Sequence, residues 1–181
     1  MFGWLRRRRE RREVVTRLYG EIVTLARAPA LYAVMAVPDT LDGRFDSLVL
    51  HTHLVLRRLG RLGAEGGRMS QLLFDLMFTD MDHTLRELGV GDLSVGRKVR
   101  QMAEAFYGRA AAYEEALAET DGNARLEGAL LRNLYRGAAP EPRALEALAA
   151  HVQALDRALA GLDLEAFRAA RLPGLSEPVP A

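Results

Sequence analysis

The chain has 181 residues and a mass of 20.0 kDa, with 49% hydrophobic and 27% charged residues, a composition typical of one globular domain. It contains no cysteine, which excludes a disulfide scaffold, thiolate metal sites and a cysteine nucleophile. The net charge of +1 excludes a strongly basic protein overall, although residues 1–17 hold seven arginines against two glutamates. No stretch approaches the ~20 apolar residues of a membrane span. We therefore expect a cytoplasmic protein, peripheral on the inner face of the inner membrane.

Apolar residues recur at helical spacing along the whole chain, and no segment alternates as a strand would. The pattern predicts an all-α fold, a single compact helical domain of about seven or eight helices. We place a basic arm at 1–12, the helical domain at 13–172 and a disordered tail at 173–181. The expected helices begin with a stripe from Val15 to Leu25 and continue at 30–37, 45–62, 69–88, 94–119, 126–137, 142–159 and 163–170.

The segment 69–88 is apolar around most of its circumference, which is typical of a helix buried on all sides. We therefore expect it to be the central helix of the domain. Glycines at 89 and 91 are expected to end it.

The sequence offers little support for catalysis. His51 and His53 lie two residues apart on a predicted helix, so their rings point away from each other and cannot share a metal ion. Asp75, Asp80 and Asp82 invite comparison with the aspartate-rich helix of all-α prenyl-transferring enzymes, which hold diphosphate through magnesium, but no second acidic cluster is present. Neither a nucleophile elbow nor a phosphate-binding loop occurs. We expect no enzyme, no catalytic residue, no metal site and no cofactor.

The N-terminal segment combines apolar and basic residues in a way that suits an anionic membrane surface. Aromatic residues prefer the headgroup zone, and each basic residue near such a surface contributes ~1 kcal/mol. A solvated arm, or one that contacts RNA, remains an alternative. The candidate membrane-surface residues are Phe2, Trp4, Leu5, Arg6, Arg7, Arg8, Arg9, Arg11 and Arg12.

The segment 37–45 is expected to form a rigid connection between helices. Pro38 stops one helix, Asp39 or Asp42 can cap the next, and Gly43 permits a turn. The capping interpretation is favoured over a dedicated binding loop on physical grounds alone.

Several segments taken together resemble the ubiquinol–cytochrome c chaperone family, whose members assist assembly of the cytochrome b subunit of the respiratory bc complex. The resemblance extends over about residues 27–135 and looks most like the bacterial branch of the family. It is carried by RAP at 27–29 with Tyr32, VPDT at 37–40, GRF at 43–45, His51, LF at 73–74, DMD at 80–82, LRELGVGD at 85–92, FYGR at 106–109, Tyr113 and LRNLY at 131–135.

The resemblance implies a non-catalytic chaperone whose client is newly made cytochrome b. Mitochondrial members pair with a smaller partner subunit and bind the ribosomal tunnel exit, so the ribosome is a further candidate partner, while nothing in this sequence shows a partner subunit. Alternatives are an all-α enzyme with an aspartate-rich metal–diphosphate site, or a membrane- or ribosome-surface module with another client. Asp80 and Asp82 could instead pair with Arg44 and be structural. The candidate client-binding residues are Asp39, Thr40, Arg44, His51, Asp80, Asp82 and Arg86.

Overall fold

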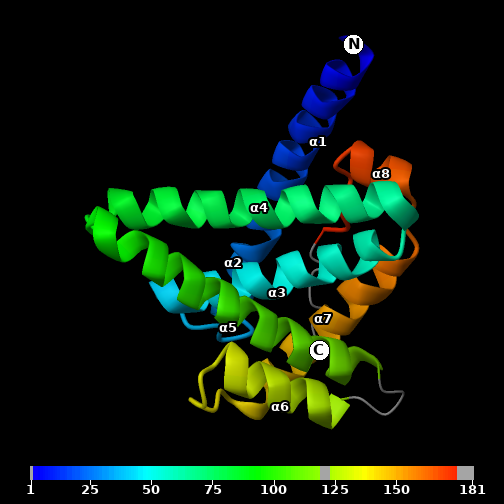
Figure 1. The fold of residues 1–181 in the computed structure, drawn as a ribbon. Coiled ribbons are helices and arrows are strands. Elements are labelled where there is room, and N and C mark those ends of the chain that lie inside the picture. The colour runs from blue at the N-terminus through cyan, green and yellow to red at the C-terminus, as the bar shows by residue number, and fades with distance from the viewer. Residues whose placement is uncertain (1, 119–122, 175–181) are drawn as a thin grey trace.

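The computed structural model describes residues 2–118 and 123–174, with only the backbone at residues 2–5 and 7. Over these residues the chain forms eight α-helices and no strand, so the predicted all-α fold is confirmed (Figure 1). The predicted tail falls largely at 175–181, outside the described residues. The helices are α1 (Phe2–Ala26), α2 (Pro29–Ala33), α3 (Leu41–Gly60), α4 (Gly63–Glu87), α5 (Asp92–Ala118), α6 (Asn123–Asn133), α7 (Pro142–Ala160) and α8 (Leu164–Arg168).

The centre of the fold is α3, which packs against α1, α4, α5 and α7. Twelve of its 20 residues are buried, whereas only five of the 25 residues of α4 are. The expectation that 69–88 forms the central helix is therefore wrong. The additional apolar side chains of α4, including Leu72, Phe74 and Met81, are only partly buried at the edge of the core.

The α4–α5 pair forms a long hairpin across one side of α3 (Figure 1). Leu88 ends α4, and Gly89 follows with φ +80°, a left-handed conformation that glycine adopts without strain. The Gly89 N–H donates to the carbonyl of Arg86 and the Val90 N–H to that of Leu85, which satisfies the helix end. The expected stop after residue 88 is thus confirmed.

From Phe2 onward the basic segment continues into the core without a break, because α1 runs from Phe2 to Ala26. The expected boundary between residues 12 and 13 lies inside this helix. The second half of α1 packs into the core through its buried residues Val15, Leu18 and Ile22. Its first half projects beyond the other helices (Figure 1). In the described part of the chain, no helix has the length and apolar character needed to cross a bilayer.

Candidate functional site

A groove of about 510 Å³ opens between the start of α3, the end of α4 and the first half of α5. Apolar side chains form most of its wall, and two of them are unusually exposed for leucines, Leu41 at 62% and Leu88 at 59%. Leu93, at the adjoining tip of the hairpin, is 100% exposed. Contiguous exposed apolar surface of this kind marks interaction sites. The lining residues are Leu41, Asp42, Phe45, Met81, Thr84, Leu85, Leu88, Lys98, Gln101, Met102, Ala105, Arg109 and Arg136.

The groove exists because α4 is longer than the helix it covers. The short turn at 61–62 joins α3 to α4, and the two helices run in opposite directions (Figure 1). With 25 residues against 20, α4 extends about 7.5 Å past the first turn of α3, at 1.5 Å per residue. The apolar stripe of α4 continues to Leu85 and Leu88, beyond the part that α3 covers, and these two side chains line the groove.

A buried carboxylate organises the polar end of the groove. Asp46 on α3 is 0% exposed, and its Oδ2 accepts a hydrogen bond of 2.8 Å from Arg136 Nε. Arg109 Nη2 on α5 lies 2.9 Å from Asp46 Oδ1, and Arg136 Nη1 lies 2.9 Å from Asp42 Oδ2. Burial raises the pKa of Asp46, and the two guanidinium groups oppose that rise. The network holds Arg109 and Arg136 in the groove wall.

Arg136 adopts φ +54°, a left-handed conformation that costs energy for a residue with a Cβ. It follows α6, and its side chain ties this turn to the start of α3. Sequence reasoning missed Asp46, Arg109 and Arg136 as a unit because they come from three separate segments. The only signal was the presence of Arg109 in one of the segments that resemble the chaperone family.

Local contacts fix the conformation of the segment that precedes the groove, and a residue other than the two expected ones caps the helix. Thr40 Oγ1, and not Asp39 or Asp42, accepts the capping hydrogen bond from the Gly43 N–H at 3.0 Å. Arg44 Nε donates to Asp39 Oδ1 at 2.6 Å, which lowers the pKa of that carboxyl. A Cβ on Gly43 would lie 2.0 Å from the Pro38 carbonyl oxygen, so this close approach requires glycine.

The three candidate residues on α4 do not line the groove, and Asp80 has a different partner from Asp82 and Arg86. Asp80 Oδ2 accepts a hydrogen bond of 2.8 Å from the Tyr19 hydroxyl on α1. Asp82 accepts from Arg86 at 2.6 Å, and Arg86 also pairs with Asp92. Arg44 pairs with Asp39, so the alternative in which Arg44 binds Asp80 or Asp82 is not what the structure has.

His51 lies in the core and not at a surface, since it is only 1% exposed. Its Nδ1 donates to the Ser47 carbonyl at 2.8 Å, which leaves Nε2 free to accept the Nε2–H of His151 at 3.3 Å. Burial lowers the pKa of both imidazoles to about 4, so they are neutral near pH 7. The expectation that His51 belongs to a client-contacting surface is therefore wrong.

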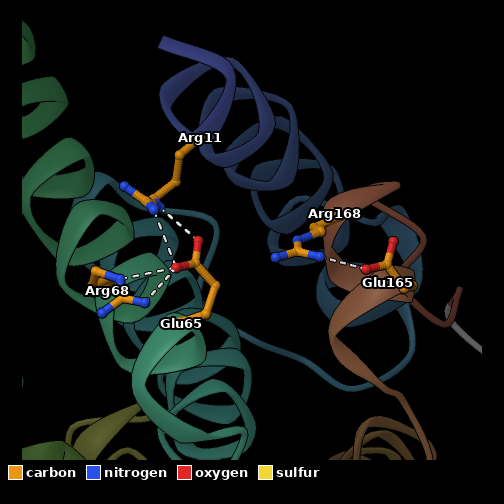
Figure 2. Close-up of polar contacts among 5 residues, drawn as sticks. All are labelled: Arg11, Glu65, Arg68, Glu165 and Arg168. Atoms are coloured by element: carbon orange, nitrogen blue, oxygen red, sulfur yellow. Dashed lines mark hydrogen bonds and ion pairs between the residues drawn. The ribbon is translucent and has the colours of Figure 1, made fainter. Parts of the chain in front are cut away.

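The candidate membrane residues on α1 differ in their surroundings. Arg11 is half-buried and makes two hydrogen bonds to Glu65 on α4, at 2.7 and 3.1 Å, so it attaches α1 to the body (Figure 2). Arg68 binds the same Glu65, and these contacts lower the pKa of that carboxyl. The exposed side of α1 instead gathers Arg8, Arg9, Arg12 and Arg17. The side chains of Phe2, Trp4, Leu5 and Arg7 lie outside the described part, and Arg6 pairs with Glu10.

In the described ranges, no three histidine, aspartate or glutamate side chains gather as metal ligands would. Asp75, Asp80 and Asp82 accept hydrogen bonds from Gln71, Tyr19 and Arg86 respectively. Asp75 and Asp82 lie on one side of α4 but about two turns apart, and Asp80 lies on another side. This arrangement does not form the convergent carboxylate clamp that a metal–diphosphate site requires.

Comparison with known proteins decides the family. The model of the ubiquinol–cytochrome c chaperone family matches residues 33–174. The chain belongs to this family. The matched region includes α3, α4 and α5 with the whole groove, and it begins after α1. The predicted resemblance is thereby confirmed.

Relatives in this chaperone family are named as assembly factors. The chain is 30% identical over 130 residues to ubiquinol–cytochrome-c reductase complex assembly factor 1 of Xenopus laevis, covering 72% of this chain. Identity to the Homo sapiens protein of that name is 27% over 117 residues, or 65% of this chain. The chain spans 64% of the length of the frog protein and 38% of the human one.

A solved structure shows the same fold over nearly the full length. The crystal structure of the Cbp3 homolog from Brucella abortus superposes with a TM-score of 0.84 at 35% identity, covering 97% of each chain. At this identity and coverage, the likeness extends to the arrangement of all the helices that form the groove.

Proposed function

We propose that this protein is a non-catalytic chaperone that binds newly made cytochrome b during assembly of the ubiquinol–cytochrome c reductase complex. Membership of the chaperone family supports a role in assembly. The observation that carries the binding role is the open groove with its exposed Leu41 and Leu88. A multi-span client exposes apolar helices before it is assembled, and an apolar groove competes with their aggregation.

The groove has the features expected of an adaptable binding surface. Met81 on α4 and Met102 on α5 both line the groove, and methionine side chains adjust to different partners at low energetic cost. In this proposal the rigid segment with Asp39, Thr40 and Arg44 forms the edge beside Leu41. Asp80, Asp82 and Arg86 lie on other sides of α4, so we assign them a structural role first.

Lys98 offers a unique labelling position for testing this proposal, because it lies in the groove wall and is the only lysine in the sequence. An amine-reactive photocrosslinker attached there on the purified chain, which is then added to membranes from cells that assemble the complex, should trap cytochrome b. Purification under mild detergent should enrich the same protein without crosslinking. Recovery of ribosomal proteins alone would point to a translation-linked module. Normal cytochrome b accumulation in a deletion strain would refute the assembly role under those conditions.

Substitutions beside the groove separate binding from folding. Arg44→Ala removes an exposed ion pair and should reduce cytochrome b accumulation while leaving the melting temperature unchanged. Asp82→Ala is the control, since it removes an ion pair on α4, with Arg86, that lies away from the groove. Equal losses in both variants would contradict a binding role for the Asp39–Arg44 edge.

We also propose that the projecting half of α1 holds the protein at an anionic membrane, on the inner face of the inner membrane. Arg8, Arg9, Arg12 and Arg17 share its exposed side, and such residues are attracted to anionic lipid in a salt-dependent manner. Vesicle flotation at low and high salt tests this. The variant with Arg8, Arg9 and Arg12 changed to Gln should float less at low salt. Unchanged flotation would leave the membrane contact without support.

A further inference from the structure

The groove lining has more basic than acidic side chains, which bears on what occupies it. Its lining holds three basic residues, Lys98, Arg109 and Arg136, and one acidic residue, Asp42. With the buried Asp46 included, three cations face two carboxylates. Arg109 and Arg136 pair with those carboxylates, and none of the ion pairs within the described residues includes Lys98. Lys98 is exposed and lies about 16.5 Å from Arg109 along α5, so the surplus positive charge of the groove is located at its ammonium group, away from the Asp46 network.

The shape of the groove favours a helical occupant. Its walls are helices α4 and α5, whose backbone groups are already paired, so they offer no strand edge to an extended peptide. An extended segment would leave its own N–H and C=O groups unpaired against Leu85, Leu88 and Met102, whereas a helix satisfies them internally. Helix α3 already lies against this hairpin, and its first residue, Leu41, lines the groove. A further helix would continue the same packing.

Building on the proposed function, we infer that the groove binds an amphipathic helix of its partner protein that carries an acidic residue beside its apolar face. The apolar face covers Leu41, Leu85 and Leu88. The acidic side chain pairs with Lys98, and complementary charge fixes the orientation of the helix more than it adds affinity. Helix-in-groove recognition of this kind reads one apolar stripe together with its flanking charge.

The test uses the purified full chain and two synthetic amphipathic helical peptides that differ only in their flanking charges, Asp in one and Lys in the other. At low salt, fluorescence anisotropy should show that the Asp peptide binds about tenfold more tightly than the Lys peptide, a preference that should weaken at high salt. Lys98→Glu should abolish or reverse this preference. Arg97→Glu is the matched control, since it makes the same charge change on α5 outside the groove.

Equal binding of the two peptides, or equal effects of Lys98→Glu and Arg97→Glu, would overturn the inference. So would binding of oleate with no binding of either peptide, which would indicate a lipid site, or self-association that Leu88→Ser abolishes. The two proposals fail separately. Cytochrome b that copurifies without any charge preference in the peptides leaves only the assembly role, whereas a charge preference without copurification leaves only the helix-binding groove.

Discussion

The interior around α3 and the groove beside it use side chains in opposite ways. Around α3, Asp46, His51 and His53 are buried, and the first two have polar partners on other segments. In the groove, Leu41 and Leu88 are exposed although the core lies next to them. Buried polar groups raise the cost of any rearrangement, because a group that loses its partner is left unpaired. The polar contacts around α3 thus hold the helices that form the groove in place. Substitutions in the interior and in the groove should therefore have separable effects.

The largest effect is expected at Asp46. Asp46→Ala removes the carboxylate that neutralises Arg109 and Arg136, and it should lower the free energy of unfolding by about 3–5 kcal/mol, as for other broken buried pairs. Urea denaturation measures this loss. Asp42→Ala is the control, because it removes only the exposed partner of Arg136 and should cost under about 1 kcal/mol. Similar losses in the two variants would mean that Asp46 does not organise the site.

The second prediction concerns acid stability. Burial lowers the pKa of His51, His53 and His151 from 6.5 to about 4. The unfolded chain therefore binds more protons than the folded chain between these pH values, and stability falls as the pH drops from 6.5 toward 4. Each such histidine contributes a slope of up to ~1.4 kcal/mol per pH unit.

Urea denaturation at a series of pH values tests this slope. His151→Asn should be less stable than the wild-type chain at pH 7 but should lose stability more slowly in acid, since one of the buried groups no longer titrates. An unchanged slope in the variant would show that His151 does not contribute to the loss.

The third prediction concerns the boundary between the two regions. Thr40→Ala removes the cap of α3 and should lower the free energy of unfolding by ~1 kcal/mol. Thr40→Ser keeps an oxygen at the capping position and should retain most of the stability. If both variants melt alike, the hydroxyl does not cap the helix, and the edge of the groove is held by the Asp39–Arg44 pair alone.

The sequence predicted most of the helix ends because these boundaries are local features, although α1 begins at Phe2 and not at Val15, and α4 at Gly63 and not at Met69. The spacing of apolar residues, Pro38 and the glycines after Leu88 all act within a few residues. It failed on the centre of the fold because the polar residues of α3 look like a solvent-facing side. Their partners lie far away in the chain, 90 residues from Asp46 to Arg136 and 100 from His51 to His151. The groove was equally hidden, since it depends on how far α4 extends past α3.

The smallest expected effect on stability sharpens the comparison most, because it compares a leucine in the middle of α4 with the leucine that ends this helix. Leu73 on α4 is 0% exposed, and Leu73→Ala should cost about 2–5 kcal/mol through lost burial and the cavity left behind. Leu88, which ends the same helix, should change stability by under about 0.5 kcal/mol when replaced by Ala. Conversely, Leu88→Ala should weaken binding of an amphipathic peptide severalfold, while folded Leu73→Ala protein should bind it normally. If Leu88 contributes little to stability and much to binding, the groove is a binding surface. A marked stability loss in Leu88→Ala would instead show that Leu88 belongs to the core.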